Sequence, residues 1–257
     1  MEKQLVKKDT ETVQSLVKGL AVIKAFGQKR PAMTLSEVAN VTGYSRAATR
    51  RFLLTLVSER YAKQEGKLFS LTAKVLDLGF SYLSTLDIWY NAKPLMTALV
   101  ERLNESCSAA VLDGFDVVYV ARVATTKRIM SINLTVGTRL PAFATSMGRV
   151  LLANMPLTKL DEFLEHCHIE QFTQYTITDK TKLAAEIANV KQQGYSMVEQ
   201  ELETGLTSIS VPVHNGEGDV TAALNVSTHM SQTARQQIFE VILPALQQCA
   251  RQVERIG

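Results

Sequence analysis

The chain has 257 residues, 46% hydrophobic and 21% charged, a composition typical of globular proteins and enough for one large domain or two modest ones. No apolar run approaches the ~18 residues of a membrane span, and the polar first residues do not form a secretory signal, so we expect a cytoplasmic protein without a membrane partner. The three cysteines lie far apart and never form a CxxC pair, which argues against a disulfide framework and a structural zinc site.

The net charge of +3 conceals an asymmetry along the chain. Residues 1–74 hold fourteen Lys and Arg against six Asp and Glu, a net charge of +8, whereas residues 75–257 hold fourteen against nineteen, a net charge of −5. Opposite signs predict two domains with different partners, the first of which faces an anion. Chance scatter of surface charge is the alternative, and the order of the elements decides between the two.

An amphipathic helix is predicted over residues 13–26, where apolar residues recur at steps of three and four. A basic loop follows, after which Thr34 is placed to cap a short helix over residues 35–41. Glu37 stands three residues after Thr34, so the two residues form a capping box. A tight turn is then expected at Gly43, because glycine adopts positive φ without strain.

A longer helix is predicted from Ser45 to about Arg60, followed by two short strands within residues 61–71 around a Glu-Gly-Lys turn. Helix, helix, tight turn, helix and hairpin is the order of a winged helix-turn-helix, whose partner is double-stranded DNA. The local charge of +8 agrees with that partner, although a basic helix face taken alone is more often a solvated surface.

Candidate DNA-binding residues come from the long helix and the hairpin. Arg46, Thr49 and Arg50 stand at i, i+3 and i+4, so we expect them on one exposed face of the helix. The first turn of a recognition helix reads base edges, and the hairpin lies near phosphates. The complete set expected at the DNA is Thr34, Ser45, Arg46, Thr49, Arg50, Arg51, Lys63 and Lys67.

Residues 74–92 read as a packed linker helix capped by Thr72, and Pro94 is expected to open the next helix or to lie in its first turn. From Cys107 onward strands and helices are segregated, which describes an α+β domain with an antiparallel sheet. Strands are expected over 108–112, 117–123, 128–134, 208–213 and 221–227, and helices over 146–154, 157–165, 180–193 and from about Thr233. The domains are therefore predicted as 1–73 for DNA binding, 74–92 as linker and 93–257 as a second domain.

The sequence contains no P-loop and no GxGxxG, GxSxG or HExxH motif, so we expect neither an enzyme nor a cofactor. The run 166–168 (HCH) lacks a fourth ligand at a plausible spacing, which argues against a metal site. Three glutamates alternate before Gly205 and are expected at a solvated loop rim: Glu199, Glu201 and Glu203.

A hydrolase or acyltransferase remains the enzymatic alternative, and it needs a base near Ser146 or Ser208. His214 and His229 are the only candidates at strand ends, and neither has an evident orienting acid in the sequence.

Polar residues inside the second domain indicate a small pocket. Residues 145–148 begin a helix, where free N–H groups and the helix dipole favour an anion. Ser208, Asn225 and Ser227 lie in strands that are otherwise apolar, and hydroxyl and amide donors suit a carboxylate. Ordinary hydrogen-bonded strand residues are an equally good explanation from the sequence alone.

Five segments together carry a resemblance to a known family: 15–26 (SLVKGLAVIKAF), 35–39 (LSEVA), 49–56 (TRRFLLTL), 136–141 (VGTRLP) and 146–153 (SMGRVLLA). In this order they make the chain similar to the IclR-type bacterial transcriptional regulators over essentially its whole length. The resemblance implies a winged helix domain, a linker helix and a GAF-like effector domain. It also implies homodimers or tetramers on palindromic operators.

The resemblance further implies where an effector binds. In members that bind small organic acids, backbone amides at the helix start hold the carboxylate, and side chains on two strands assist. The matching positions here are Ser146, Met147, Gly148, Ser208, Asn225 and Ser227.

The pocket positions depart from the pattern for small keto acids. Ser146 and Met147 replace smaller residues, and Val198 stands where an acid is often found. The chain looks more similar to the branch that regulates aromatic-acid breakdown, so protocatechuate or p-hydroxybenzoate is the expected effector. A different small organic acid, or a second domain that only oligomerises, stays open as an alternative.

Overall fold

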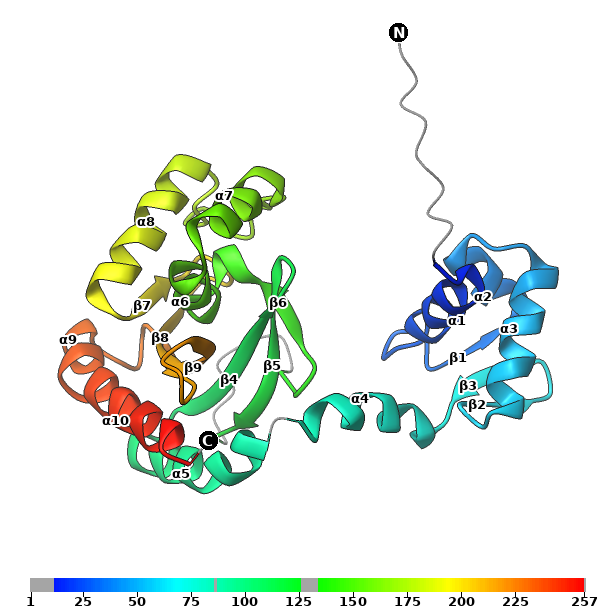
Figure 1. Ribbon diagram of the computed structural model, residues 1–257, viewed down its shortest axis with the longest axis horizontal. Helices are drawn as coiled ribbons and strands as arrows, with labels where there is room; N and C mark the ends of the chain where they lie inside the picture. The colour runs from blue at the N-terminus through cyan, green and yellow to red at the C-terminus, as the bar shows by residue number, and fades with distance from the viewer. Residues whose placement is uncertain (1–11, 86, 126–133, 257) are drawn as a thin grey trace, which may run out of the picture. The chain divides into compact units, whose positions relative to one another are not determined.

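The computed structural model describes residues 12–85, 87–125 and 134–256. The chain divides into two compact units, Met1–Thr85 and Leu86–Gly257, which are described separately below (Figure 1).

Three helices form most of the first unit: α1 (Gln14–Lys24), α2 (Leu35–Thr42) and α3 (Arg46–Ser58). The capping box at the start of α2 is present, with Glu37 N donating to Thr34 Oγ1 and Thr34 N donating to Glu37 Oε2. Gly43 ends α2 with φ of 71°, a left-handed conformation that lets the chain turn directly into α3. Ser45 caps α3 by accepting a hydrogen bond from Ala48 N at 3.3 Å.

A three-stranded antiparallel sheet completes this unit, in the order β1-β3-β2. The hairpin of β2 (Ala62–Glu65) and β3 (Leu68–Leu71) confirms the predicted wing, with Gly66 in its turn at φ of 60°. The sequence did not predict β1 (Ala32–Thr34), which pairs with β3. Apolar residues from all three helices and the sheet form one core: Val22, Phe26, Met33, Val38, Leu53, Leu56, Ala62 and Phe69.

The linker differs from the prediction. Thr72 accepts a hydrogen bond from Lys74 N, and a short 3-10 turn leads into α4 (Leu76–Leu83). A second helix, α5, already begins at Asp87 and runs to Leu103, so Pro94 lies inside this helix instead of opening it. Pro94 has no N–H and forgoes one helical hydrogen bond, a local loss that the rest of the 17-residue helix tolerates.

The second unit is built on a six-stranded antiparallel sheet with the strand order β6-β5-β4-β9-β8-β7. The four long strands confirm the predicted ones and extend them by a few residues, whereas both edge strands were missed. The expected strand 128–134 lies outside the described residues, except for Leu134, which is in no strand. The strands are β4 (Ser106–Asp113), β5 (Asp116–Val123), β6 (Arg139–Pro141), β7 (Ser196–Glu199), β8 (Leu206–His214) and β9 (Val220–His229).

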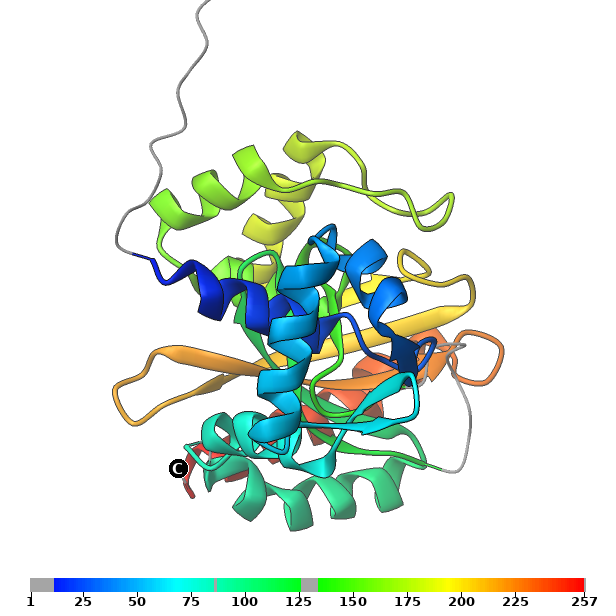
Figure 2. The ribbon, with the colours of Figure 1, turned by 90° about the vertical axis from the view of Figure 1, so that its right-hand side faces the viewer.

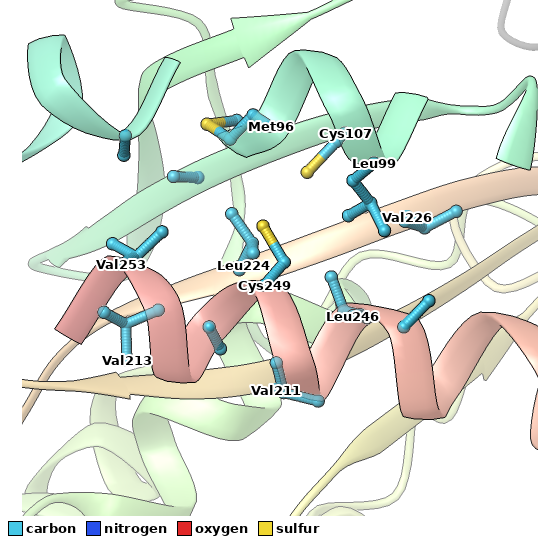
Figure 3. Packing of buried hydrophobic residues seen from close by; sticks show 14 of the residues in the cluster. Met96, Leu99, Cys107, Val211, Val213, Leu224, Val226, Leu246, Cys249 and Val253 are labelled. Carbon is cyan, nitrogen blue, oxygen red and sulfur yellow. The ribbon is translucent and has the colours of Figure 1, made fainter. Parts of the chain in front are cut away.

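Helices cover both faces of this sheet (Figures 1 and 2). On one face α5 packs beside α10 (Leu243–Glu254), which continues a helical run that begins at Arg235. Figure 3 shows the apolar side chains between these two helices and the strands, among them Met96, Leu224 and Leu246. The other face carries α6 (Ser146–Asn154), α7 (Leu157–His166) and α8 (Lys180–Gln193).

The start of α6 is packed unusually closely against the chain that precedes it. A Cβ atom built on Gly148 would lie 2.1 Å from the carbonyl oxygen of Ala142, so only glycine fits at this position. This close approach fixes the first turn of α6 over β8 and β9, the two strands that the helix contacts most.

Candidate functional site

Small polar side chains gather on the sheet face beneath α6. Ser208 of β8 lies opposite Ser227 of β9, and Ser210 lies opposite Asn225. Residues directly opposite each other in an antiparallel pair point to the same face, and so do residues two positions apart in one strand. These four side chains therefore form a polar patch within a sheet whose other face is apolar.

Hydrogen bonds join the patch to the start of α6. Ser146 Oγ lies 2.8 Å from Ser208 Oγ and 2.6 Å from Ser210 Oγ. Asn225 Nδ2 donates to Ser208 Oγ at 2.9 Å and to Ser227 Oγ at 3.0 Å. The structure thus brings together four of the six predicted pocket residues in one network. Ser210 was missed, although it follows Ser208 by the two-residue step that defines one face of a strand.

A small recess lies over this network: its cavity volume is about 20 Å³, and the surrounding empty space of about 370 Å³ includes open solvent. Met147 and Val198 are in its wall, whereas Gly148 is not: its N–H donates to Thr145 Oγ1 at 3.1 Å. The recess therefore has one polar side and several apolar ones. Its lining is Tyr119, Leu140, Ala144, Thr145, Ser146, Met147, Val198, Glu201, Leu202, Leu206, Ser208, Asn225 and Ser227.

Two groups in the recess define its hydrogen-bonding character. Asn225 is 3% exposed, and its Oδ1 atom has no partner among the described residues. Burial raises the pKa of Tyr119 to about 12, so its phenol stays protonated at physiological pH. The recess consequently combines an acceptor that needs a donor with a neutral hydroxyl.

A buried ion pair holds one wall of the recess. Arg149 of α6 and Glu201, in the loop between β7 and β8, have side chains only 1% and 8% exposed, with Nη2 and Oε2 2.7 Å apart. Two backbone groups add to the pair: Arg149 Nε donates to Phe143 O at 3.0 Å, and Ile177 N donates to Glu201 Oε2, the oxygen that also faces Arg149, at 2.9 Å. The pair thus ties three separate segments together around the recess.

The expectation that three glutamates share a solvated rim is wrong for Glu201, which is buried against Arg149. Glu199 pairs with Arg235, the first residue of the C-terminal helical run, and so points away from the rim. The loop is held further by Thr176, whose Oγ1 donates to the carbonyl oxygen of Glu201 at 2.7 Å. Arg149 lies 52 residues from Glu201 in the sequence, and no local pattern links the two.

His214 also differs from the prediction, because an acid does orient it: Nδ1 lies 2.6 Å from Glu254 Oε1. His214 is nevertheless six residues from Ser208 along β8, which is roughly 20 Å at the rise of a strand. His229 contacts the hydroxyl of Ser231 instead of a carboxylate. Neither histidine reaches Ser146 or Ser208, so the geometry of a serine hydrolase is not formed.

The first unit displays most of the predicted DNA-facing residues on its surface. Arg46, Arg50 and Arg51 are exposed on α3, and Lys63 and Lys67 are exposed on the wing. Lys63 Nζ lies 2.7 Å from Glu65 Oε1, which offsets part of the charge of the wing.

Two predicted DNA contacts are used internally. Thr49 is 0% exposed, contrary to the expectation of an exposed face, because the buried stripe of α3 runs through Thr49, Leu53 and Leu56. Its hydroxyl donates to Ser45 O at 3.0 Å, which satisfies the buried oxygen. The hydroxyl of Thr34 is likewise bound to Glu37 within the capping box.

Both units of the chain match known protein families. Residues 15–66 match the IclR helix-turn-helix domain, and residues 80–255 match the C-terminal domain of the bacterial transcriptional regulator IclR. The chain belongs to the IclR family. It is thus a DNA-binding transcriptional regulator and not an enzyme, as the sequence indicated. None of the helices in the described parts of the chain is long and apolar enough to cross a bilayer.

The chain is also similar to individual regulators. The Pca regulon regulatory protein of Pseudomonas putida is 42% identical over 243 residues, which cover 95% of this chain and 84% of the relative. The p-hydroxybenzoate hydroxylase transcriptional activator of Acinetobacter baylyi is 34% identical, with 95% and 92% covered. A crystal structure of a regulator from Rhodococcus sp. RHA1 is 44% identical, covers 95% of this chain and 98% of its own, and superposes with a TM-score of 0.84.

The buried ion pair generates a stability prediction. Arg149→Met leaves the carboxylate of Glu201 buried without its charge partner, so we expect the second unit to lose about 3–5 kcal/mol of unfolding free energy. Arg149→Met combined with Glu201→Leu removes both charges and restores most of that loss. Urea unfolding followed by the fluorescence of Trp89, buried in this unit and the only tryptophan, measures both effects.

Arg235→Met is the matched control, because it breaks the exposed pair with Glu199 and costs only about 0–1 kcal/mol. A loss for Arg149→Met no larger than that of this control would contradict the role assigned to the buried pair.

Proposed function

We propose that this chain regulates genes of aromatic-acid catabolism, binding operator DNA through its first unit and a small aromatic carboxylate in the recess of its second. The observation that carries the proposal is the recess itself, in which an apolar wall faces a serine–asparagine network and the neutral phenol of Tyr119. A ring substituted with polar groups matches such a surface. The named functions of the relatives in Pseudomonas and Acinetobacter support the same class of effector.

DNA binding is assigned to the exposed residues of α3 and the wing. Ser45, Arg46 and Arg50 lie at the start of the helix that follows the tight turn, the part of a recognition helix that reads the major groove. Arg51, Lys63 and Lys67 are assigned to phosphates, which bind all sequences alike. Thr34 and Thr49 are left out of this assignment because their hydroxyls are used within the unit.

Arg46→Ala is expected to cost about 1–3 kcal/mol on operator DNA and to reduce the preference over random duplex, because arginine reads guanine through two hydrogen bonds. Lys67→Ala is expected to weaken binding to both duplexes equally and to lower the salt dependence by about one ion. Fluorescence anisotropy titrations at several salt concentrations measure both. Equal losses on the two duplexes for both variants would contradict the division between base and phosphate contacts.

Assembly into homodimers or tetramers on a palindromic operator is part of the proposal, and α4 supplies the surface for pairing. Its apolar side chains are exposed, with Leu76 at 73% and Phe80 at 68%, and Leu78 and Tyr82 are half exposed. Leu86, expected on the same surface, lies outside the described residues. Exposed apolar side chains in such number on one short helix are typical of a protein interface.

Phe80→Asp is expected to shift the protein toward monomers, since a carboxylate cannot be buried at an apolar interface without a partner. Sedimentation velocity at several concentrations measures the shift. Ser81→Asp introduces the same charge at the neighbouring exposed position of α4 and serves as the control. Identical sedimentation of wild type and Phe80→Asp would exclude this surface as the interface.

Binding of the effector is tested by anisotropy on DNA from beside the gene, with a panel of aromatic and short-chain acids at fixed salt. We expect 4-hydroxybenzoate or protocatechuate to change operator affinity while affinity for random duplex stays unchanged. A response to a short-chain acid alone would replace the aromatic effector with another organic acid. Operator binding that no acid alters would leave the second unit as an assembly module.

The cytoplasm is the proposed place of action, since a bacterial regulator meets chromosomal DNA there. The DNA-binding family supports this location.

A further inference from the structure

Lys18 of α1 lies beside the turn that leads into α3. Its Nζ atom is 5.7 Å from the centre of the Tyr44 ring, and Tyr44 directly precedes Ser45, the N-cap of α3. The Tyr44 ring packs in turn near Phe52 of α3, with 6.5 Å between the two ring centres. The first helix of the chain thus brings a cation to the end of α3 that is assigned to the major groove.

The position of α1 relates this cation to a residue already assigned to DNA. A groove between α1 and α3 is lined by Ser15 and Gly19 of α1 and by Arg51 and Phe52 of α3, among others. Arg51, which is assigned to a phosphate, therefore lies on the side of α3 that faces α1. Lys18 adds a second cation on this side of the helix, contributed by a different element.

The ammonium group of Lys18 keeps its capacity for hydrogen bonds. Lys18 is half-buried, and it forms no ion pair with any residue in the described part of the chain. Its contact is the face of the Tyr44 ring, which attracts a cation but has no lone pair to accept a hydrogen bond. The N–H donors of Lys18 are therefore available to an oxygen ligand from outside the protein.

Lys74 shows a different arrangement at the other end of α3. Its Nζ atom lies 4.8 Å from the centre of the Tyr61 ring, but it also donates to the carbonyl oxygen of Glu59, the C-cap of α3, at 2.9 Å. A lysine suits a helix C-terminus, where the last carbonyl groups have no helical partner. The ammonium of Lys74 thus has a structural use within the unit, whereas that of Lys18 has no such acceptor.

The chemistry and the place of Lys18 favour a phosphodiester group of DNA. Phosphates border the major groove, so a helix that enters the groove brings its flanking elements to the backbone. Lysine binds a phosphate as a flexible point charge and needs no fixed geometry. An ammonium beside the start of α3 is therefore suited to the backbone and not to a base edge inside the groove.

We propose that Lys18 binds a phosphate of the DNA backbone beside the major groove that α3 enters, and that the ring of Tyr44 positions its ammonium group. This inference rests on the proposed assignment of α3 to the major groove and extends the DNA-binding surface to α1. A phosphate contact carries no base preference, so Lys18 contributes equally to operator and random duplex.

Anisotropy titrations of the full chain on operator and random duplex, at several salt concentrations, test the site. Lys18→Met keeps an unbranched side chain and removes the charge, so we expect about 10-fold weaker binding to both duplexes, as for the loss of one charge-assisted hydrogen bond. The salt dependence is expected to fall by about one ion. Lys74→Met removes the same charge from the same unit at the far end of α3 and is expected to keep the wild-type salt dependence.

A double-mutant cycle tests the positioning role of Tyr44. Tyr44→Leu is expected to weaken DNA binding about threefold when Lys18 is present and to have no further effect in Lys18→Met, because the ring acts through the ammonium. Tyr44→Phe keeps the ring and is expected to bind like the wild type. If Tyr44→Phe binds as weakly as Tyr44→Leu, or if Tyr44→Leu costs as much without Lys18 as with it, the ring does not position Lys18.

Thermal unfolding separates a DNA contact from a structural role. Without DNA, Lys18→Met is expected to keep the melting temperature within about 3 °C of the wild type, since only one partly exposed contact with a ring is lost. A larger fall would assign Lys18 to the fold and overturn the inference. A loss of affinity on the operator alone would make Lys18 a base contact and overturn the assignment to a phosphate.

The outcomes also distinguish this inference from the proposed function. If Lys18→Met binds both duplexes with the affinity and salt dependence of the wild type, while Arg46→Ala loses its preference for the operator, the site on α1 fails and the assignment of α3 stands. If Arg46→Ala also binds the operator like the wild type, α3 is not the helix that reads the major groove, and both assignments fail together.

Discussion

The buried ion pair between Arg149 and Glu201 joins the first helix above the sheet to the loop that rims the recess, and the shape of the site depends on it. Both side chains are almost fully buried, and each also bonds to a backbone group, Arg149 to Phe143 and Glu201 to Ile177. Such a pair costs free energy to bury and is strongly directional once formed. The pair holds the loop between β7 and β8 at a fixed distance from α6, so the distance between these two walls of the recess is fixed as well.

The two faces of the large sheet divide stability and recognition between them. The face against α5 and α10 is continuous apolar packing, in which Cys107 and Cys249 act as small apolar side chains (Figure 3). The opposite face carries Ser208, Ser210, Asn225 and Ser227, whose polar atoms weaken a core but suit a ligand. Because the apolar face supplies the burial that folds the unit, the polar face can keep the unsatisfied acceptor of Asn225.

Local patterns in the sequence predicted local structure well. The capping box of Thr34 and Glu37 depends on neighbours three residues apart, and it is present. The period of two along β8 and β9 likewise brought Ser208, Asn225 and Ser227 to one face.

What the sequence could not predict depends on distant partners or weak signals. Strands of three or four residues are too short to show a period: β2 and β3 were predicted from the Glu-Gly-Lys turn between them, whereas β1, β6 and β7 were missed. Thr49 reads as polar and therefore exposed, yet a hydrogen bond within one helical turn allows its burial. Glu201 owes its role to Arg149, a partner that only the folded chain brings next to it.

The short edge strands of the large sheet limit aggregation between copies of this protein. Exposed sheet edges are templates for strand addition and aggregation. Here the edges are β6, of three residues, and β7, of four, and the β6 edge bears the charged fork of Arg139 bound to two aspartates. Little backbone is left to pair with a foreign strand, which protects the folded protein against edge-to-edge aggregation at high concentration.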